Sequence, residues 1–461
     1  MKARLVLFVT VFSLGIPASR SLAQGAIPVG TARVDVTPED HVRLVGYESR
    51  RTESEGVASR LMAVAIAIGG DPDAAVLVAV DNCAVGGLVV EEVAARLAKR
   101  AGLKRERLAV CSTHTHCAPG LTGTLDFILG GGLPADQRGR LAKYTAQLTD
   151  AIEKAALEAL ANRAPATLAW TQGRIDFAAN RRVLKNGVWT GFGVNPSGPT
   201  DPSVPVLRAI DAQGKTKAIL LGYACHCTTL GGEFNKICAD WAGYARDEIE
   251  KRNPGATALV VIGCGADANP EPRRGLDDAI HHGTALGTLV DRLAKSTMTP
   301  LPGRIEARLK RLELPLEKPP SRAELVALAT KPAAQGAFAR SLLERLEKGE
   351  TLPTTVPYVV QTWCFGDQMA MVFLAGEVVV DYSLRLKWEI GKKRLWINAY
   401  SNDVPCYIPS RRVLSEGGYE ADFSMIYYGR PARFTPAIED LITGAVHDLL
   451  PAPFDSPQPG E

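Results

Sequence analysis

Apolar residues in this chain follow two patterns, and each pattern predicts one kind of element. The run "AVLVAVDNCAV" at 75–85 is almost continuously apolar, which is typical of a buried strand. In "LVVEEVAARLAKRAG" at 88–102, apolar residues recur at helical spacing and Gly102 can cap the end. The next run, "LAVCSTHTH", predicts another strand. This β-α-β order favours parallel strands joined by a right-handed crossover.

The other patterns extend this unit into one α/β domain of mixed β-sheets with packed helices. Further helices are predicted over 137–162, 242–252, 279–296 and 436–450, and further strands over 31–45, 166–225 and 358–388. Since no repeat or linker divides the chain, we expect a single domain over 27–450 with a charged helical insertion at 316–350. The Pro-rich end, 451–461, is predicted to be a disordered tail.

The N-terminus has the order of a secretory signal peptide. Basic residues, an apolar run and then "SLA" follow one another within residues 1–23, and the apolar run is too short to span a bilayer comfortably. A retained anchor is the alternative. Removal of this segment lowers the formal net charge from +3 to zero, so nothing indicates a nucleic-acid partner. No later segment is long and apolar enough to span a membrane, so we expect a secreted or periplasmic protein.

The nine cysteines do not alternate along the chain as a disulfide framework would. Most lie within a few residues of polar motifs, so we interpret them as small buried side chains around one site. One or two disulfides, such as Cys225–Cys238, remain an alternative.

"VCSTHTHCAPGL" carries the most informative polar residues of the chain. His114 and His116 are two residues apart at the end of a predicted strand, so both are expected on one face. Two imidazoles on one face can share a metal, or one can bind metal while the other contacts substrate. The HxHxD pattern of metallo-β-lactamases is excluded, because position 118 is alanine.

Several other residues are weaker candidates. His226, in "GYACHCTTLGG", is the best further histidine ligand, although a core role is the alternative. "VVIGCGADANPEPRR" has a GxGxxA pattern, but its prolines leave no helix N-terminus for a pyrophosphate, so a turn presenting Asp267 and Asn269 to a cleft is favoured. Glu377, in "AGEVVV", either begins a helix or ligates a metal.

Taken together and in order, the motifs resemble those of the neutral/alkaline (non-lysosomal) ceramidase family. The matching segments are "GTARVDVTP", "VASRLMAVAIAI", "CSTHTHCAPG", "NRR", "YACHCTTLGG", "ADWAGYARDEIE", "AGEVVV" and "SNDVPCYIPSRRVLSEGGYE". They cover nearly the whole length after the predicted signal peptide. The resemblance implies a ceramidase-type catalytic domain. We expect no C-terminal immunoglobulin-like domain, because the chain stops soon after the last motif.

The resemblance also implies a site with one Zn²⁺. Its ligands, carried over to the matching positions, are His114, His226, Glu377 and Tyr407. His116, Arg181 and Tyr419 match family residues that contact substrate or the developing oxyanion. This assigns zinc binding to the first histidine of the pair and substrate contact to the second.

One departure from the family pattern affects the expected chemistry. The family's nucleophile segment reads G-D-V-S-P-N, but here "GCGADANPEP" contains no serine. The implied activity is therefore hydrolysis of an amide bond in an N-acyl, ceramide-like lipid by metal-activated water, with Asp267 or His116 handling the proton. The alternatives are a zinc hydrolase acting on a non-lipid ester or carbohydrate, and an inactive binding protein of the same fold. The sequence leaves the oligomeric state open.

Overall fold

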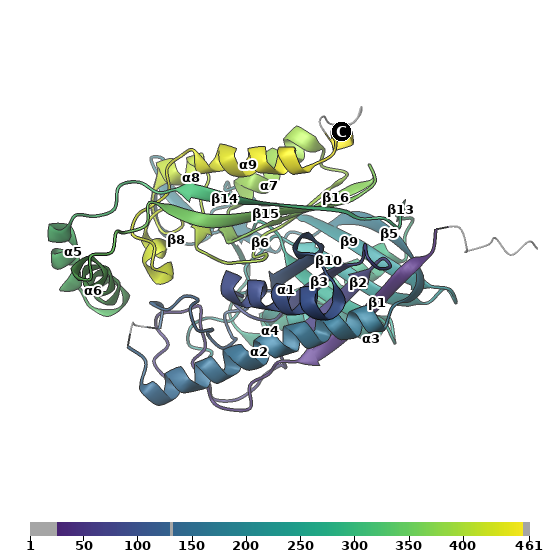
Figure 1. The fold of residues 1–461 in the computed structure, drawn as a ribbon, viewed down its shortest axis with the longest axis horizontal. Coiled ribbons are helices and arrows are strands. Elements are labelled where there is room, and N and C mark those ends of the chain that lie inside the picture. The colour runs from purple at the N-terminus through teal and green to yellow at the C-terminus, as the bar shows by residue number, and fades with distance from the viewer. Residues whose placement is uncertain (1–24, 130–131, 455–461) are drawn as a thin grey trace, which may run out of the picture.

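Two β-sheets packed face to face form the centre of the molecule (Figure 1). The computed structural model describes residues 25–129 and 132–454. The predicted signal peptide, residues 1–23, lies outside these residues. The predicted α/β class with mixed sheets is confirmed.

The larger sheet is mixed and carries a parallel pair at each edge. From edge to edge its strands are β11 (Thr257–Ile262), β10 (Thr216–Tyr223), β9 (Ser203–Asp211), β5 (Ala164–Arg174), β1 (Ile27–Asp35), β2 (Met62–Ile68), β3 (Ala75–Val80) and β4 (Leu108–Ser112), with β13 (Thr299–Leu301) paired to β5. β10 runs parallel to β11, and β3 runs parallel to β4. The second of these pairs confirms the β-α-β unit predicted around 88–102.

The smaller sheet lies across one face of the larger sheet. Its strands, in order, are β14 (Glu306–Pro315), β15 (Thr355–Phe365), β16 (Met369–Leu374) and β18 (Leu395–Asn398). Large apolar side chains from both sheets, among them Trp170, Trp363, Phe373 and Trp396, fill the space between them. Burial of this interface is the main reason for the sheets to stack.

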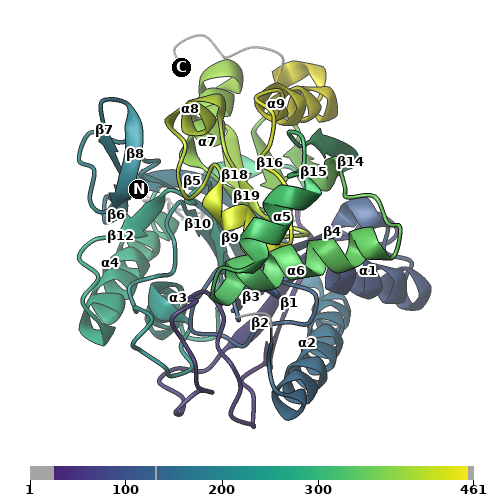
Figure 2. The same ribbon diagram turned by 90° about the vertical axis from the view of Figure 1, so that its left-hand side faces the viewer.

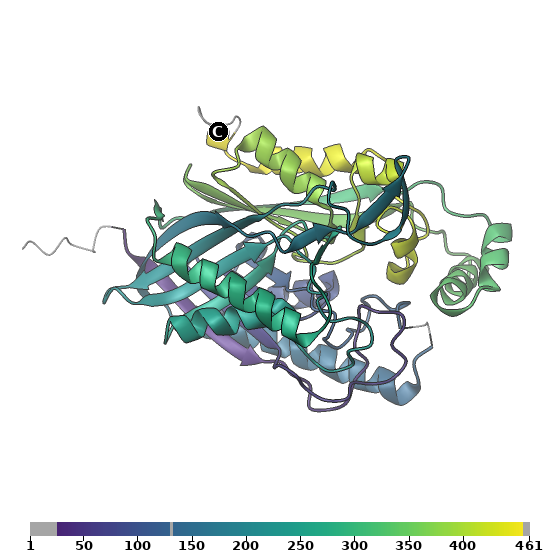
Figure 3. The same cartoon turned by 180° about the vertical axis from the view of Figure 1, so that it is seen from behind.

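Helices cover both outer faces and give the molecule four layers. α1 (Gly87–Ala101), α2 (Ala135–Ala161), α3 (Asp240–Arg252) and α4 (Leu276–Ala294) lie on the side of the larger sheet, and Figure 3 shows α3 and α4 side by side. α7 (Val380–Ile390) and α9 (Ile438–Leu449) cover the smaller sheet. α5 (Arg322–Ala329) and α6 (Ala333–Glu347) lie in the segment predicted as a helical insertion and project from one end (Figure 2). No helix among the described residues is long and apolar enough to cross a membrane.

Three predicted segments differ from the structure. Strands joined by a Pro-Glu-Asp turn are predicted over 31–45, but the first ends at Asp35 and the second is only an isolated bridge at Leu44. The strands predicted over 358–388 give way to α7 at Val380. Of the predicted tail, Ala452–Phe454 forms a 3₁₀ turn, and the Phe454 ring is fully buried. Burial of the Phe454 ring stabilises this turn, and the Pro-rich composition of the segment does not indicate that contribution. Residues 455–461 lie outside the described part of the chain.

The two edges of the larger sheet approach each other, and this brings distant loops together. β4 and β11 are in contact, and the chain after β18 lies between their carboxyl ends. The Ala399 amide donates to the Ile262 carbonyl on one side, while the Ser112 amide donates to the Tyr400 carbonyl on the other. The loops that follow β4, β10, β11 and β16 therefore meet at one end of the molecule.

Candidate metal centre

Two histidines at this end are oriented by backbone carbonyl groups. His114 Nδ1 is 2.7 Å from the Cys83 carbonyl oxygen, and His226 Nδ1 is 2.8 Å from the Gly265 carbonyl oxygen. Because a carbonyl oxygen only accepts, each Nδ1 carries the hydrogen and each Nε2 keeps its lone pair. His114 also has a positive φ of 58°, an uncommon backbone conformation that turns its ring inward after β4.

Glu377 reaches the same point from the segment that follows β16 of the smaller sheet. It lies in the short strand β17 (Glu377–Val378), which pairs in parallel with β19 (Tyr407–Ile408) and places Glu377 directly beside Tyr407. Gly376 precedes it at a φ of 82°, where a Cβ atom would lie 2.7 Å from the Cys406 carbonyl oxygen, so only glycine fits this turn. The carboxylate is 3% exposed.

The three side chains leave their lone pairs facing one another. Glu377 Oε2 is 3.2 Å from His114 Nε2 and 3.3 Å from His226 Nε2, yet it has no hydrogen-bond partner within residues 25–129 and 132–454. Zinc ligands about 2.0–2.1 Å from their ion in a tetrahedron lie roughly 3.3 Å from each other. A buried carboxylate oxygen without a donor is costly unless a cation satisfies it. The donor set and its spacing therefore fit a divalent metal ion.

Burial and mutual attraction shift the pKa values of these groups in opposite directions. Burial lowers the pKa of His114, but the adjacent Glu377 carboxylate outweighs burial and raises that pKa to about 10. Burial raises the pKa of Glu377, but His114 and His226 hold it well below its usual value. A proton on His114 thus takes the role that a bound cation would have beside Glu377.

A second possible ligand group shares His114. It consists of Cys83, His114 and His116, with Cys83 Sγ 3.7 Å from His114 Nδ1. Since His114 Nδ1 already donates to the Cys83 carbonyl oxygen, this nitrogen has no lone pair for a metal. The group formed by His114, His226 and Glu377 is the better metal site.

Tyr407 and Arg181 close the site beside His226. The Tyr407 hydroxyl is 3.4 Å from His226 Nε2 and accepts a hydrogen bond of 3.0 Å from Arg181 Nη2. Arg181 Nη1 is itself 3.2 Å from His226 Nε2. Tyr407 is therefore placed as a fourth oxygen donor, and a guanidinium cation stands next to it.

A cavity of about 230 Å³ opens above these residues. Of the residues predicted to contact substrate, His116, Arg181, Asn269 and Tyr419 line it, together with Tyr407. The ligand candidates His114, His226 and Glu377 are not on its wall, because they lie below His116 and Tyr407. The structure thus places the first histidine of the pair at the floor and the second facing the cavity.

His116 is held neutral by its surroundings. Burial, followed by the neighbouring His114 and His226, keeps its pKa well below the usual value. Its Nδ1 is buried without a partner, and its Nε2 is 3.1 Å from His114 Nε2. At Gly46, which has a φ of 107°, a Cβ atom would lie 2.5 Å from the His116 ring, so this close packing requires glycine.

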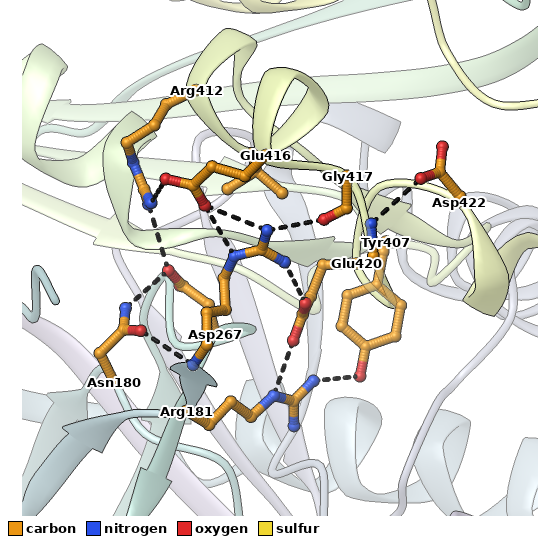
Figure 4. Close-up of polar contacts among 12 residues, drawn as sticks. Asn180, Arg181, Asp267, Tyr407, Arg412, Glu416, Gly417, Glu420 and Asp422 are labelled. Carbon is orange, nitrogen blue, oxygen red and sulfur yellow. Dashed lines mark hydrogen bonds and ion pairs between the residues drawn. The ribbon is translucent and has the colours of Figure 1, made fainter. Parts of the chain in front are cut away.

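Asp267 does not face the cavity, and the predicted role in handling a proton is not supported by its position. Its carboxylate is fully buried, with Oδ1 accepting from the Val380 amide and Oδ2 from Asn180 Nδ2 (Figure 4). Val380 is the first residue of α7, so Asp267 satisfies the N-terminus of this helix. The turn before β12 (Ala268–Pro270) directs Asp267 inward, while Asn269 points to the cavity.

Glu420 is a residue that the sequence did not identify. It is fully buried and accepts from Arg181 Nε at 2.8 Å with one oxygen and from Arg182 with the other (Figure 4). It therefore fixes the guanidinium that faces Tyr407. The only signal in the sequence is its position directly after Tyr419, which local pattern alone does not distinguish from a surface glutamate.

All nine cysteines are buried free thiols, as predicted for most of them. The alternative disulfide, Cys225–Cys238, is absent. Cys225 packs in the main core beside β10, whereas Cys238 belongs to a small cluster with Cys117 and Leu230. The two side chains therefore lie in different clusters.

Solved structures with the same fold support this architecture. The neutral ceramidase from Pseudomonas aeruginosa is 19% identical, with a TM-score of 0.68 over 93% of this chain and 75% of that chain. A ceramidase complexed with C2 is 18% identical, with a TM-score of 0.68 over 95% of this chain and 77% of that chain. At this identity the likeness shows a shared fold.

The family itself is shown by sequence. The family model for neutral/alkaline non-lysosomal ceramidase, N-terminal, matches residues 28–269, which is more than half of the chain. This range includes both ligand histidines, His116, Arg181 and the turn with Asn269. The chain belongs to the neutral/alkaline non-lysosomal ceramidase family.

Proposed function

We propose that this protein is a zinc-dependent hydrolase that cleaves the amide bond of an N-acyl substrate with water. Family membership indicates a ceramidase-like hydrolase. The observation that carries the finer proposal is the convergence of His114 Nε2, His226 Nε2 and the unpartnered Glu377 Oε2 beneath a cavity. Together with the Tyr407 hydroxyl, these atoms would hold the ion. When bound, it would supply Lewis-acid activation of water and of the scissile carbonyl.

The residues of the cavity wall provide the remaining chemistry. His116, kept neutral by its low pKa, is the group that can accept a proton from the attacking water. Arg181 places a guanidinium beside the Tyr407 hydroxyl, where negative charge on the carbonyl oxygen would develop. Tyr419 lies against both, with its ring centroid 5.4 Å from that of Tyr407 and 5.8 Å from the Arg181 guanidinium carbon.

Water is the nucleophile in this proposal because the loop after β11 has no serine. Ala266 and Ala268 flank Asp267 there. The nearest small hydroxyl on the cavity wall is that of Thr228, which donates to Asn269 Oδ1 at 3.2 Å. Since this hydroxyl is already engaged with an amide rather than with a base, it lacks the partner that activates a nucleophile.

An apolar surface beside the cavity favours an acyl chain. Phe192, at the end of β8 (Val188–Phe192), lines the cavity and is 54% exposed. Its ring contacts Trp189, which in turn contacts Phe423, and this second phenylalanine is 55% exposed. Exposed apolar surface next to a polar cavity is suited to a substrate with a lipid tail and a polar head. An N-acyl lipid is therefore the proposed substrate.

The cavity itself supports one alternative. Its lining includes four tyrosines, two arginines, Glu48 and Asn269, and its volume of about 230 Å³ is small for a long chain. A compact substrate, such as a carbohydrate or a small ester, would fill such a space by hydrogen bonding. This reading keeps the metal site and changes only the bond that is cleaved.

Export is a further part of the proposal. The basic, apolar and small residues within 1–23 support a cleaved signal peptide and a secreted or periplasmic protein. Mass spectrometry of the N-terminus of protein recovered outside the cytoplasm tests this. An uncleaved N-terminus bound to the membrane would instead support a retained anchor.

The decisive experiment is to measure metal content and amide hydrolysis in one preparation. We expect about one zinc per chain and release of fatty acid from an N-acylsphingosine, with loss of release on chelation and recovery on adding zinc. Zinc without release from this lipid, but with turnover of an ester or glycoside, would support the alternative. Zinc without turnover on any such panel would indicate an inactive binding protein, and absence of zinc would refute the proposal.

A further inference from the structure

The cavity contains a second arginine whose charge is not matched. Arg273 follows the loop after β12 and lines the cavity, and its side chain is half-buried. Its one hydrogen bond within the described chain runs from Nη2 to the Tyr47 hydroxyl at 3.1 Å. Among the described residues, no carboxylate lies within ion-pair distance of this guanidinium. An arginine has five N–H donors, so most of its capacity is open.

The other cavity arginine shows what a fully matched guanidinium looks like. Arg181 donates to Glu420, Asn269 and Tyr407 and forms a buried ion pair with Glu420 at 2.8 Å. Each of its three guanidinium nitrogen atoms has a defined protein partner. Arg273 lacks such an anion, although it lies in the same cavity.

The acidic residue of the cavity is already committed to the protein. Glu48 accepts from the Tyr427 hydroxyl at 2.9 Å and from the Ala334 amide at 3.2 Å, with one oxygen each. It thereby joins the loop at Gly46 to the start of α6. Neither of these two contacts of Glu48 involves Arg273.

The position of Arg273 relates it to the metal centre. Tyr47, its partner, packs edge-on against the His116 ring with centroids 4.9 Å apart. His116 Nε2 is in turn 3.1 Å from His114 Nε2. Arg273 is therefore connected to His114 through two rings, those of Tyr47 and His116.

We propose that Arg273 determines specificity by binding an anionic group on the amine side of the substrate, such as the carboxylate of an N-acyl amino acid. A guanidinium recognises a carboxylate through paired charge-assisted hydrogen bonds. This inference rests on the proposed amide hydrolysis. Water adds to the acyl carbon, the C–N bond breaks, and the products are a fatty acid carboxylate and a protonated amino acid. A ceramide head group, being neutral, would leave Arg273 without a counter-ion.

Two substrates that differ only at the predicted contact test the inference. N-lauroylglycine and N-lauroylethanolamine have the same acyl chain and amide, but one ends in a carboxylate and the other in a hydroxyl. We expect the zinc-loaded protein to cleave the glycine conjugate with a kcat/KM roughly 10- to 100-fold higher, as one charged hydrogen-bonded contact allows.

Substitutions at Arg273 assign this preference to the side chain. Arg273→Gln should raise KM for the glycine conjugate by roughly the same 10- to 100-fold and raise KM for the ethanolamine conjugate by a much smaller factor. Arg273→Lys, which keeps the charge, should retain part of the preference. Arg274→Gln is the matched control, because Arg274 is exposed, pairs with Asp278 at 3.0 Å and does not line this cavity.

The outcomes separate this inference from the proposed function. Equal cleavage of both amides, unaffected by Arg273→Gln, would overturn the role of Arg273 while leaving amide hydrolysis intact. Cleavage of neither amide would count against the proposed function. In that case calorimetric binding of N-lauroylglycine decides the inference, because weaker binding to Arg273→Gln than to wild type supports it and equal binding overturns it.

Discussion

Two buried clusters of charged residues lie side by side beneath the cavity, and they differ in how their polar atoms are satisfied. We call the first the ligand cluster; it consists of His114, His226 and Glu377. The second, the arginine network, consists of Arg181, Arg182, Asp267, Arg412, Glu416 and Glu420 (Figure 4). In the arginine network every carboxylate accepts from a guanidinium, an amide or both. In the ligand cluster, Glu377 Oε2 has no donor.

This difference sets the ligand cluster apart as the proposed metal site. Burial and charge are common to both clusters, and a raised or lowered pKa occurs in each. Of the two, the ligand cluster is the one whose nitrogen and oxygen atoms lie at the spacing of metal ligands. In the arginine network, hydrogen bonds within the protein offset the cost of burying the charged groups. The network thereby holds the cavity wall in place.

The largest predicted effect is removal of a ligand. His114→Ala should abolish zinc binding and lower hydrolysis by at least roughly 1000-fold, because the site loses one of its two histidine ligands. Metal analysis and initial rates measure both effects. His281→Ala is the control, since His281 is exposed on α4. If His114→Ala kept its zinc while His116→Ala lost it, the two histidine roles would be exchanged.

Loss of an ion pair in the arginine network should mainly lower the free energy of unfolding, with a smaller effect on the rate of hydrolysis. Glu420→Gln removes the charge shared by Arg181 and Arg182, and loss of one partner of a buried ion pair costs about 3–5 kcal/mol. Urea denaturation monitored by tryptophan fluorescence measures the change. Glu416→Gln, in which a partly exposed partner of Arg182 is replaced, should cost only about 1 kcal/mol. Equal losses in the two variants would contradict the distinction.

The boundary between the floor and the wall of the site can be tested at His116. His116→Ala should keep its zinc and lose roughly 100- to 1000-fold in kcat, because it removes a proton acceptor and no ligand. Zinc content and kcat measured on the same sample check this. Zinc loss would place His116 in the ligand cluster instead.

The smallest effect concerns the pH dependence of stability at Asp267. Burial, and then the Asp381 carboxylate, raises the pKa of Asp267 to about 6, above its ordinary value of 3.8. The folded protein therefore binds a proton that the unfolded chain has released, and this contribution to stability falls as the pH rises from about 4 to about 6. Asp267→Asn removes this pH-dependent contribution, which is at most about 3 kcal/mol of the free energy of unfolding.

Unfolding free energies of the wild type and Asp267→Asn at pH 4 and pH 7 check this prediction. The advantage of the wild type over the variant should be larger at pH 4. An advantage that grows with pH would show that Asp267 is stabilised as a carboxylate by its amide donors and Arg412.

The candidate site shows which assignments are accessible to sequence reasoning. The fold class and the histidine pair followed from local patterns, and His226 was the best further histidine. For Glu377 the residues left a choice between a helix start and a ligand. The structure shows why: the carboxylate at the start of α7 is Asp267, which is 113 residues away in sequence. Asp267, which the sequence predicts to face the cleft, therefore has the helix-start role that was one of the two alternatives for Glu377.

The sequence by itself determined the elements, the buried strands and the histidines at strand ends, because periodicity and turn residues act over a few positions. Tertiary structure alone decided which polar side chains meet. The contact of β4 with β11 joins segments more than 140 residues apart, and the pairing of β17 with β19 joins segments 30 residues apart. Whether a buried charge finds a partner depends on those contacts. Glu377 Oε2 and the Arg273 guanidinium are therefore recognised as open only in the folded chain.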